Sequence, residues 1–378
     1  NDTVSVDGDG TTSDIYVEGE SGADSISVFD YNGDLTVYGD DNGGAPDGND
    51  TIIVDATGAD DDSDVTSIFG EGGDDYIYFS NRDVDGTDEG DADLISGGAG
   101  NDSIFVDSED DATVSGGSGA DSIVVTSDDD MLVDGDSGDD LITANIGDGG
   151  ADAGTINGGT GNDTLNVNTN DTDESSTITG GDGDDQINLS SSITGGEDTI
   201  VFGTIVYNAL QQQTTNNQDH DTITNFNFEL GGPGDEDVLD FSDFINDFFA
   251  PTDLDSDPIE YGDWRSGLNE VDLANGGNDD DAVAVIAAND GFVLNASHIS
   301  ANDGDNAIII EDNSAGIVII GKDTDGVLGY DEFDVYFVQD VDSDAGQAWA
   351  VDHVATIESI TQIGALTSID IANMIIPT

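Results

Sequence analysis

Apolar residues occur in the first half of the chain as short β-branched runs, and glycine- and aspartate-rich segments separate these runs. The pattern is clearest between Ser96 and Asn145, where three runs repeat in register. Side chains alternate across a strand, so every second residue of a run shares one face. The pattern therefore predicts short strands whose inward faces stack into a narrow core. The predicted inward residues of this stretch are Ile104, Ile123, Ile142, Val106, Val125 and Ala144.

An aspartate lies two residues before each of the three isoleucines, and Asp102, Asp121 and Asp140 are spaced by 19 residues. A fixed period near 20 residues is typical of a solenoid in which each repeat forms one coil. The same frame recurs at longer intervals toward the N-terminus, which indicates longer loops in those coils. The aspartates at this position are Asp24, Asp50, Asp75, Asp102, Asp121, Asp140, Asp163 and Asp185, and a shortened last copy contains Asp198.

Glycines precede each aspartate in a frame that reads G-G-x-G-x-D-x-U-x, where U is a large apolar residue. Glycine is needed because the turn adopts backbone angles that are closed to residues with a Cβ. The aspartate then adds an anionic oxygen beside crowded backbone carbonyls. Several converging oxygens suit Ca²⁺, which accepts many oxygen ligands in a tolerant geometry. Each turn is therefore a candidate calcium site.

These copies resemble the nonapeptide repeats of the RTX (hemolysin-type calcium-binding) family. The resemblance implies a parallel β-roll with calcium in its turns. Its specificity comes from six or more copies in register, since glycine and aspartate are common in any turn. The frame and the resemblance assign the metal ligands to Asp24, Asp50, Gly70, Gly72, Asp75, Gly97, Ala99, Asn101, Asp102, Gly116, Ser118, Ala120, Asp121, Gly135, Ser137, Asp139, Asp140, Gly158, Thr160, Asn162, Asp163, Gly180, Asp182, Asp184, Asp185 and Asp198.

The repeat departs from the family in its second half. A roll with two nonapeptides in each coil would repeat the glycine motif every nine residues, whereas the intervening segments Ser108–Asp111 and Ser127–Asp130 are acidic and lack glycine. We therefore expect one ordered calcium row along the glycine edge. Sites on the opposite edge are expected to be fewer, weaker or built from side chains alone.

A second domain follows near residue 200, where the glycine density falls and phenylalanine, isoleucine and valine become more frequent. We expect an all-β protein with an RTX parallel β-roll at residues 1–200 and a β-rich capping domain at residues 201–378. Ser242 is predicted to cap a short helix that buries Phe244, Ile245 and Phe248. Asn289-Asp290 is predicted to join two strands, 281–288 and 291–295, in a hairpin.

The C-terminal domain is similar to the segment that follows the repeats in RTX exoproteins. The apolar tail Ile363–Thr378 resembles an uncleaved type I secretion signal, which implies the type I secretion apparatus as a partner. The chain opens with the second half of a repeat, so we expect it to begin inside a longer repetitive protein or at a processed end. We expect an extracellular or bacterial cell-surface location.

A separate acidic segment resembles the latter part of an EF-hand loop. Asp323, Asp325 and Glu332 occupy ligand positions of that pattern, and Gly326 lies at its sharp turn. However, Gly321 stands where the first aspartate of the pattern should be, and the flanking sequence predicts strands. The alternatives are an isolated calcium site and an acidic β-turn.

The charge of the chain calls for an external source of cations. The sequence contains 86 acidic and 3 basic residues, for a formal charge of −83. Such a chain repels itself, so we expect the calcium-free chain to be expanded and largely unfolded. Adaptation to a salty medium would also explain the acidity, but not the register of the aspartates. The charge excludes direct binding to nucleic acid or an anionic membrane, and no apolar run is long enough for a transmembrane segment.

The residues needed for common types of catalysis are missing. The three histidines, His220, His298 and His353, form no His-Glu-x-x-His motif, and the chain has no Gly-x-Ser-x-Gly motif and no cysteine. We therefore expect no enzymatic activity in this chain.

Apolar residues also recur at outward positions of the middle strands. The residue after the first inward position of each strand is apolar at Ile53, Tyr78, Phe105 and Val124. Something is expected to cover this stripe: either the long loops or the C-terminal domain, or a second copy of the chain.

The expected function is that of a secreted calcium-binding structural protein. It would self-assemble in a calcium-dependent way into a surface layer or an extracellular fibre. The alternative is the roll and secretion module of a larger adhesin or exoenzyme.

Overall fold

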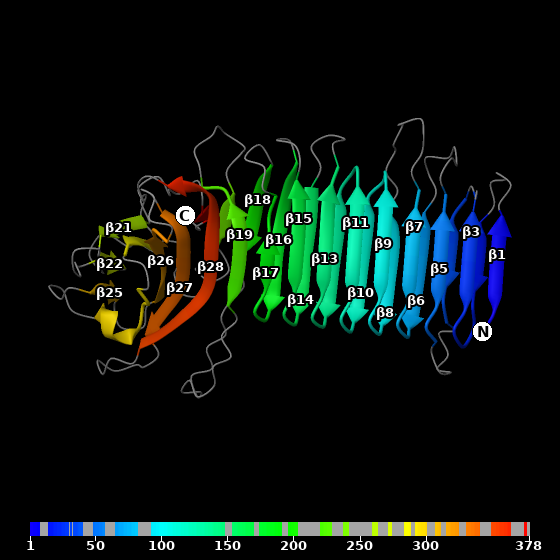
Figure 1. Cartoon of the computed structure of the whole chain (residues 1–378), viewed down its shortest axis with the longest axis horizontal. Coiled ribbons are helices and arrows are strands. Elements are labelled where there is room, and N and C mark those ends of the chain that lie inside the picture. Colours follow the sequence, from blue (N-terminus) through cyan, green and yellow to red (C-terminus); the bar gives the residue numbers. More distant parts are fainter. Residues whose placement is uncertain are drawn as a thin grey trace. The chain divides into compact units, whose positions relative to one another are not determined.

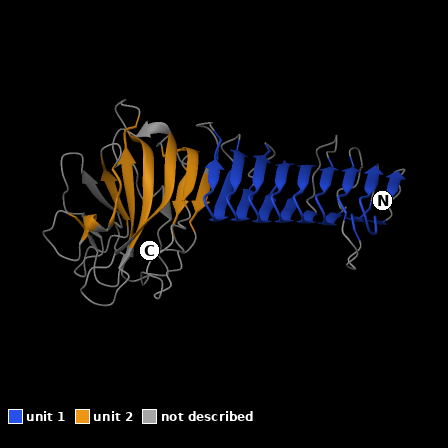
Figure 2. Cartoon of the chain, turned by 60° about the horizontal axis from the view of Figure 1, so that its bottom comes forward, with its two compact units in different colours: residues 1–196 blue, residues 197–378 orange. Residues whose placement is uncertain are grey.

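The structure is a computed structural model that describes part of the chain. The described residues are 1–7, 14–29, 31, 33–40, 48–56, 65–81, 92–147, 153–169, 174–190, 196–202, 220–228, 237–241, 259–263, 271–273, 283–288, 292–300, 307–310, 315–324, 330–340, 349–363 and 374–375. The chain divides into two compact units, Asn1–Gly196 and Glu197–Thr378 (Figure 2).

Unit 1 is a solenoid with two parallel sheets, and each coil contributes one strand to each sheet (Figure 1). The first sheet contains, in spatial order, β1 (Thr3–Asp7), β3 (Ser25–Phe29), β5 (Thr51–Asp55), β7 (Tyr76–Ser80), β9 (Ser103–Ser108), β11 (Ser122–Ser127), β13 (Leu141–Ile146), β15 (Thr164–Thr169) and β17 (Gln186–Asn188). The second contains β2 (Ile15–Glu18), β4 (Leu35–Tyr38), β6 (Thr66–Gly72), β8 (Asp93–Ala99), β10 (Ala112–Ser118), β12 (Met131–Ser137), β14 (Ala153–Thr160) and β16 (Ser175–Asp182). The predicted all-β parallel solenoid is confirmed.

The core of unit 1 lies between the two sheets, where the predicted inward residues meet. Ile123 pairs in register with Ile104 and with Ile142, and all three side chains are buried. Val106, Val125 and Ala144 are also buried, as the alternation predicted. The second sheet contributes a matching column of Ile68, Ile95, Val114, Val133, Ile156 and Ile178. Stacking in register gives each coil the same cross-section, so the apolar column is continuous.

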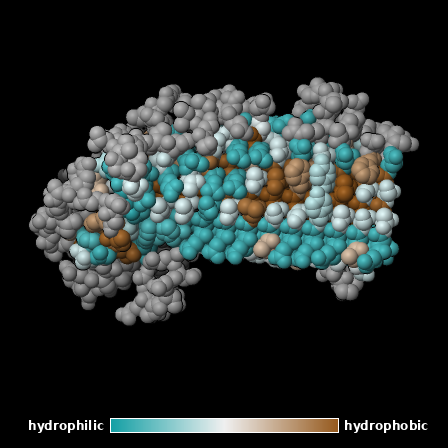
Figure 3. Space-filling model, in the orientation of Figure 1, coloured by the Kyte–Doolittle hydropathy of each residue, from teal (hydrophilic) through white to brown (hydrophobic). Residues whose placement is uncertain are grey.

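The outward apolar stripe lies across β5, β7, β9 and β11 in register. Ile53, Tyr78, Phe105 and Val124 are successive partners on these strands. The rings of Tyr78 and Phe105 are parallel, with their centroids 5.3 Å apart. Figure 3 shows the stripe as a brown band on a face that is otherwise mostly hydrophilic. Tyr76 and Leu141, on the same sheet, are 46% and 45% exposed.

Unit 2 is built around a mixed sheet. Its main sheet has the order β19 (Asp221–Phe226), β28 (Trp349–Ile363), β27 (Tyr330–Asp340), β26 (Ala315–Lys322), β23 (Val283–Ala287) and β21 (Ile259–Asp263). The smaller sheets contain β18 (Glu197–Val201), β20 (Val238–Asp240) and β29 (Met374–Ile375), and β22 (Val271–Leu273), β25 (Ile308–Ile310) and β24 (Ile299–Ser300). The β26–β27 and β27–β28 pairs are antiparallel.

The predicted hairpin at Asn289-Asp290 is wrong, although these two residues lie outside the described part of the chain. Strand β23 pairs in parallel with β21 and β26, and residues 292–295 form no strand. All five residues of β23 are buried, so the strand lies in the sheet interior with both faces covered. Leu294 instead packs beside Ile286 in a buried apolar cluster. Burial of both strand faces outweighed the local turn signal.

Two further predictions for unit 2 concern a helix after Ser242 and the C-terminal tail. The helix predicted after Ser242 lies outside the described residues. Within the described part of the chain, the single helical element is η1, a 3₁₀ turn at Ala296–His298. Part of the tail that resembles a secretion signal forms β29, which pairs in parallel with β20.

The alternation of faces in unit 1 makes a direct prediction for stability. Replacement of Ile123 with alanine is expected to lower the free energy of unfolding by about 2–5 kcal/mol, because it opens a cavity in the stacked column. Replacement of the adjacent outward Val124 with alanine is expected to cost well under half as much. Urea unfolding followed by circular dichroism would measure both. Equal losses would contradict the assignment of faces.

Candidate metal site along the glycine edge

The predicted aspartates form a buried column along one edge of unit 1. We call Asp24, Asp50, Asp75, Asp102, Asp121, Asp140, Asp163 and Asp185 the aspartate column; each is at most 4% exposed. The Oδ1 atom of each column member from Asp50 onward accepts a hydrogen bond from the backbone N–H of the previous member, at 2.7–2.8 Å. The carboxylates are therefore fixed in orientation, coil by coil.

The second carboxylate oxygen, Oδ2, of most column aspartates is buried without a hydrogen-bond partner among the described residues. Oδ2 is buried and makes no hydrogen bond to described residues in Asp24, Asp50, Asp75, Asp102, Asp121, Asp140 and Asp163. A buried polar atom without a partner costs about 1–3 kcal/mol, and more when it is charged. A row of such atoms, repeated at the same place from Asp24 to Asp163, therefore calls for a partner that the described residues do not supply.

Glycine in the motif makes room for these oxygens. A methyl group built on Gly116 would lie 2.5 Å from Asp121 Oδ2 and 2.9 Å from the carbonyl oxygen of Gly135 in the next coil. A side chain would collide with both atoms. The first glycine of the motif is therefore required because a carboxylate oxygen and a backbone carbonyl oxygen converge beside its Cα. The next residue, Gly117, has φ of 105°, which favours glycine for a separate reason.

Burial shifts the ionisation of the column. Loss of hydration raises the pKa of Asp75 to about 8, of Asp140 to about 7, and of Asp50 and Asp102 to about 6. Neighbouring column carboxylates add to the rise, while hydrogen bonds from backbone N–H groups oppose it. Without a cation, the column would thus hold protons well above the usual range of an aspartate.

A second ladder lies on the exposed side of the same turns. Side-chain oxygens here accept hydrogen bonds from the following coil: Asp74 from Asn101 N–H at 2.9 Å, and Asn101 from Ala120 N–H at 2.8 Å. Asp139, Asn162 and Asp184 continue the pattern. In this ladder, the backbone N–H of a later coil donates to a side chain of the coil before it. In the aspartate column, the N–H of an earlier coil donates to the carboxylate of the coil after it. The two ladders together brace each turn against both neighbours.

The site residues predicted along the glycine edge divide into a buried group and an exposed group. The column aspartates and Gly70, Gly72, Gly97, Gly116, Gly135, Gly158 and Gly180 are buried along the edge. The residues Ala99, Asn101, Ser118, Ala120, Ser137, Asp139, Thr160, Asn162, Asp182 and Asp184 are exposed. In this exposed group, the carbonyl oxygens of Ala99, Ser118, Ser137, Thr160 and Asp182 accept hydrogen bonds from glycine N–H groups of the previous coil.

Sequence reasoning missed two buried acids related to the column. Asp237 in unit 2 repeats the column contact: its carboxylate accepts the N–H of Asp198 at 3.3 Å and that of Asn227 at 2.7 Å. The interval of 39 residues from Asp198 hid Asp237 from a frame with a period near 20. Asp40 is buried in an early coil of unit 1. It occupies the motif position that later coils fill with Glu71, Gly98, Gly117 and Asp136.

The opposite edge of unit 1 is built from hydroxyl groups. Ser108 and Ser127 are fully buried there, and their Oγ atoms accept hydrogen bonds from the N–H groups of Asp110 and Asp129. Ser127 Oγ also donates to the carbonyl of Asp110, at 2.8 Å. Asp110 and Asp129 in these turns are partly exposed. A buried acid also lies at this edge: Asp93 is 1% exposed, and its carboxylate accepts hydrogen bonds from Thr66 N–H at 3.0 Å and from Ser108 Oγ at 3.4 Å.

The segment that resembles an EF-hand loop lies at a hairpin between β26 and β27. Glu332 is the register partner of Lys322 across this hairpin, and its Oε1 accepts a hydrogen bond from Lys322 Nζ at 3.1 Å. Asp331 instead binds the N–H and hydroxyl of Thr324. Asp323 is half-buried, and Asp325 lies outside the described residues. Residues 325–329, between the two strands, lie outside the described part of the chain, so the choice between an isolated calcium site and an acidic β-turn stays a prediction.

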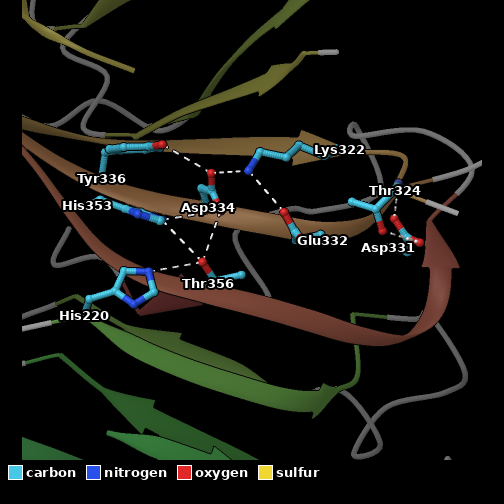
Figure 4. A network of polar contacts seen from close by, with 9 residues as sticks. All are labelled: His220, Lys322, Thr324, Asp331, Glu332, Asp334, Tyr336, His353 and Thr356. Atoms are coloured by element: carbon cyan, nitrogen blue, oxygen red, sulfur yellow. Dashed lines mark hydrogen bonds and ion pairs between the residues drawn. The ribbon is translucent and has the colours of Figure 1, made fainter. Parts of the chain in front are cut away.

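A polar network in unit 2 surrounds the buried Asp334 (Figure 4). Lys322 forms an ion pair with Asp334, and Tyr336 and Thr356 donate hydroxyl hydrogen bonds to the same carboxylate. His353 lies 3.4 Å from Asp334 Oδ1. Although burial opposes ionisation, His353 and Lys322 hold the pKa of Asp334 at about 2. Every carboxylate oxygen here has a partner, so the network serves unit 2 as a polar crosslink between β26, β27 and β28.

Comparisons with known proteins identify no relative of this chain: no family model, no curated protein and no solved structure matches it. Among the described residues, no helix is long and apolar enough to cross a membrane.

The donors at the glycine edge fit a hard cation. The coils from Asp24 to Asp163 each supply one buried carboxylate oxygen that makes no hydrogen bond to described residues, and one glycine carbonyl that faces the same point, as at Asp121 and Gly135. Oxygen ligands with anionic charge are those that Ca²⁺ prefers. The described residues of unit 1 include no lysine or arginine to neutralise the column. Both the charge and the donor chemistry therefore suit calcium.

The raised pKa values predict how stability depends on pH in chelator. The folded column binds protons that the unfolded chain has released, so stability present near pH 4 is lost as the pH rises through about 6 to 8. Circular dichroism of the chelated chain between pH 4 and pH 8.5 would follow this loss as a transition from the folded to the unfolded chain. Replacement of Asp75 with asparagine removes one of the groups responsible and is expected to move the transition to higher pH.

The matched control is Asp74→Asn, which removes the same charge from an exposed neighbour whose pKa is lowered by Asn101. This variant is expected to keep the loss of stability above pH 6. If both variants behaved alike, general charge repulsion rather than burial of the column would govern the pH dependence.

Proposed function

We propose that the chain is a secreted calcium-binding structural protein of the RTX type, with a row of Ca²⁺ ions along the glycine edge. The single observation that carries the proposal is the row of buried Oδ2 atoms without hydrogen bonds. Bound calcium would give each of these atoms a ligand and would neutralise a column that burial otherwise keeps protonated. The acidic surface then depends on the same ions, because the chain carries a formal charge of −83.

In this proposal the ions act as part of the fold. A carboxylate of one coil and a carbonyl of the next would share an ion, so binding would join neighbouring coils. Metal binding that requires a folded site contributes its free energy to folding. At the opposite edge, serine hydroxyls close the turns at Ser108 and Ser127, which supports fewer calcium sites there than along the glycine edge.

Calcium titration of the chelated chain at pH 7.5 tests the proposal. Calcium is expected to produce a β-type far-UV circular dichroism spectrum and to reduce the hydrodynamic radius, and chelator is expected to reverse both changes. Magnesium at equal ionic strength is the control for screening, because Mg²⁺ retains its water ligands and demands octahedral geometry. Asp102→Asn together with Asp121→Asn is expected to weaken the response.

Two results would overturn calcium binding as the function. One is a folded spectrum that does not change when calcium is removed. The other is an equal response to magnesium or to sodium chloride, which would leave adaptation to salt as the explanation of the acidity.

We further propose that calcium-loaded copies assemble with one another into a surface layer or a fibre outside the cell, after type I secretion. The support for assembly is the outward stripe of Ile53, Tyr78, Phe105 and Val124, which presents apolar side chains from four adjacent strands. Two such acidic surfaces would repel each other without cations. Assembly is therefore expected to require calcium as well as the stripe.

The double variant Tyr78→Ser with Phe105→Ser is expected to abolish assembly and to leave a calcium-stabilised monomer. Sedimentation velocity and negative-stain microscopy with calcium would measure assembly, and circular dichroism would check the fold. Thr143→Ser with Asn166→Ser, farther along the same outward column, is the matched control. Lone particles of the unmodified chain with calcium would favour the alternative, a module of a larger adhesin or exoenzyme.

A further inference from the structure

Asp40 departs from its equivalents in the other coils. The strand register aligns Asp40 with Glu71, and Glu71 with Gly98 and Gly117. These equivalents have positive φ, and Asp40 does not. Glu71 is half-exposed at this position, whereas Asp40 is only 1% exposed. The backbone of this one coil therefore turns an aspartate side chain inward.

The carboxylate of Asp40 lies between two coils of the solenoid. Its Oδ2 accepts a hydrogen bond from Gly48 N–H at 2.8 Å, and its Oδ1 accepts a longer one from Gly22 N–H at 3.3 Å. Gly22 and Gly48 each come two residues before a column aspartate, Asp24 and Asp50. These two hydrogen bonds hold the Asp40 carboxylate beside Asp24 and Asp50 of the aspartate column.

Three buried carboxylates meet here. Asp24, Asp40 and Asp50 each place one oxygen within 4.8 Å of an oxygen of the other two. Two of the three side chains also carry a buried Oδ2 without a hydrogen bond, and these residues, Asp24 and Asp50, are 4% and 2% exposed. A methyl group built on Gly39, the residue before Asp40, would collide with Asp50 Oδ2. This oxygen therefore faces the segment that brings in the third acid.

We propose that Asp24, Asp40 and Asp50 form a distinct calcium site, which binds more tightly than the other positions of the column. Three carboxylates at this separation repel one another strongly unless a cation lies among them. Within the described part of the chain, no other three acidic side chains bring their oxygens this close together. A third carboxylate raises the charge of the site, and ligand charge is a main determinant of calcium affinity. This inference rests on the calcium binding proposed for the column.

The inference predicts that the tightest step of calcium uptake belongs to these three residues. Isothermal titration of the full chain with Ca²⁺, and with Tb³⁺ as a luminescent probe, is expected to show one step that is tighter than the rest. Asp40→Asn is expected to weaken this step by about tenfold or more, and native mass spectrometry is expected to show one ion fewer at low calcium. Asparagine keeps an oxygen that accepts the N–H of Gly48, so the turn is expected to form.

The control variant is Asp74→Asn, which removes one exposed charge and is expected to keep the tight step. Asp40→Glu, which retains the charge, is expected to keep a larger part of the affinity than Asp40→Asn. A tight step that survives in Asp40→Asn would overturn this site while calcium binding by the column stands. Absence of calcium uptake by the unmodified chain would overturn both this site and the proposed function.

Discussion

Stacking equal coils forces like charges together, and the other features of unit 1 follow from that constraint. Neighbouring strands of a sheet lie about 4.8 Å apart, so an aspartate at a fixed place in every coil becomes a column of carboxylates at about that spacing. The Oδ1 row satisfies its hydrogen bonds through backbone N–H groups, while the Oδ2 row of Asp24 to Asp163 receives none from described residues. Such an arrangement is stable only when protons or cations compensate the charge.

The two edges of the solenoid meet this constraint differently. At the glycine edge, the absence of a side chain on residues such as Gly116 lets a carboxylate oxygen and a carbonyl oxygen converge. At the opposite edge, Ser108 and Ser127 close the turns with neutral hydroxyl groups. Among the described residues, the glycine edge is the one that carries a buried aspartate in coil after coil, so cations would compensate the most charge there. In unit 2, by contrast, Lys322 compensates a buried carboxylate directly.

Features that repeat once in every coil could be predicted from the sequence. The inward isoleucines and the column aspartates each repeat with the coil, so a single alignment places all of them. Asp237 was missed because a long insertion breaks the period, and Asp40 because its side-chain direction depends on one backbone angle. The hairpin at Asn289-Asp290 was wrong for a third reason: β23 is buried on both faces, and long-range pairing then outweighs local turn propensity.

The affinity of one proposed cation site in such a column would depend on whether the neighbouring coils are also occupied. Each carboxylate of the column repels the one before and the one after it, and its Oδ1 also binds the backbone of the previous coil. A cation at one coil therefore lowers the cost of charge in both adjacent coils and helps to order them, as in other linear repeat structures whose stability depends on nearest-neighbour terms. Ordering would then spread from the coil with the greatest density of carboxylates. In the described part of unit 1 that coil contains Asp40, where a third buried acid joins two members of the column.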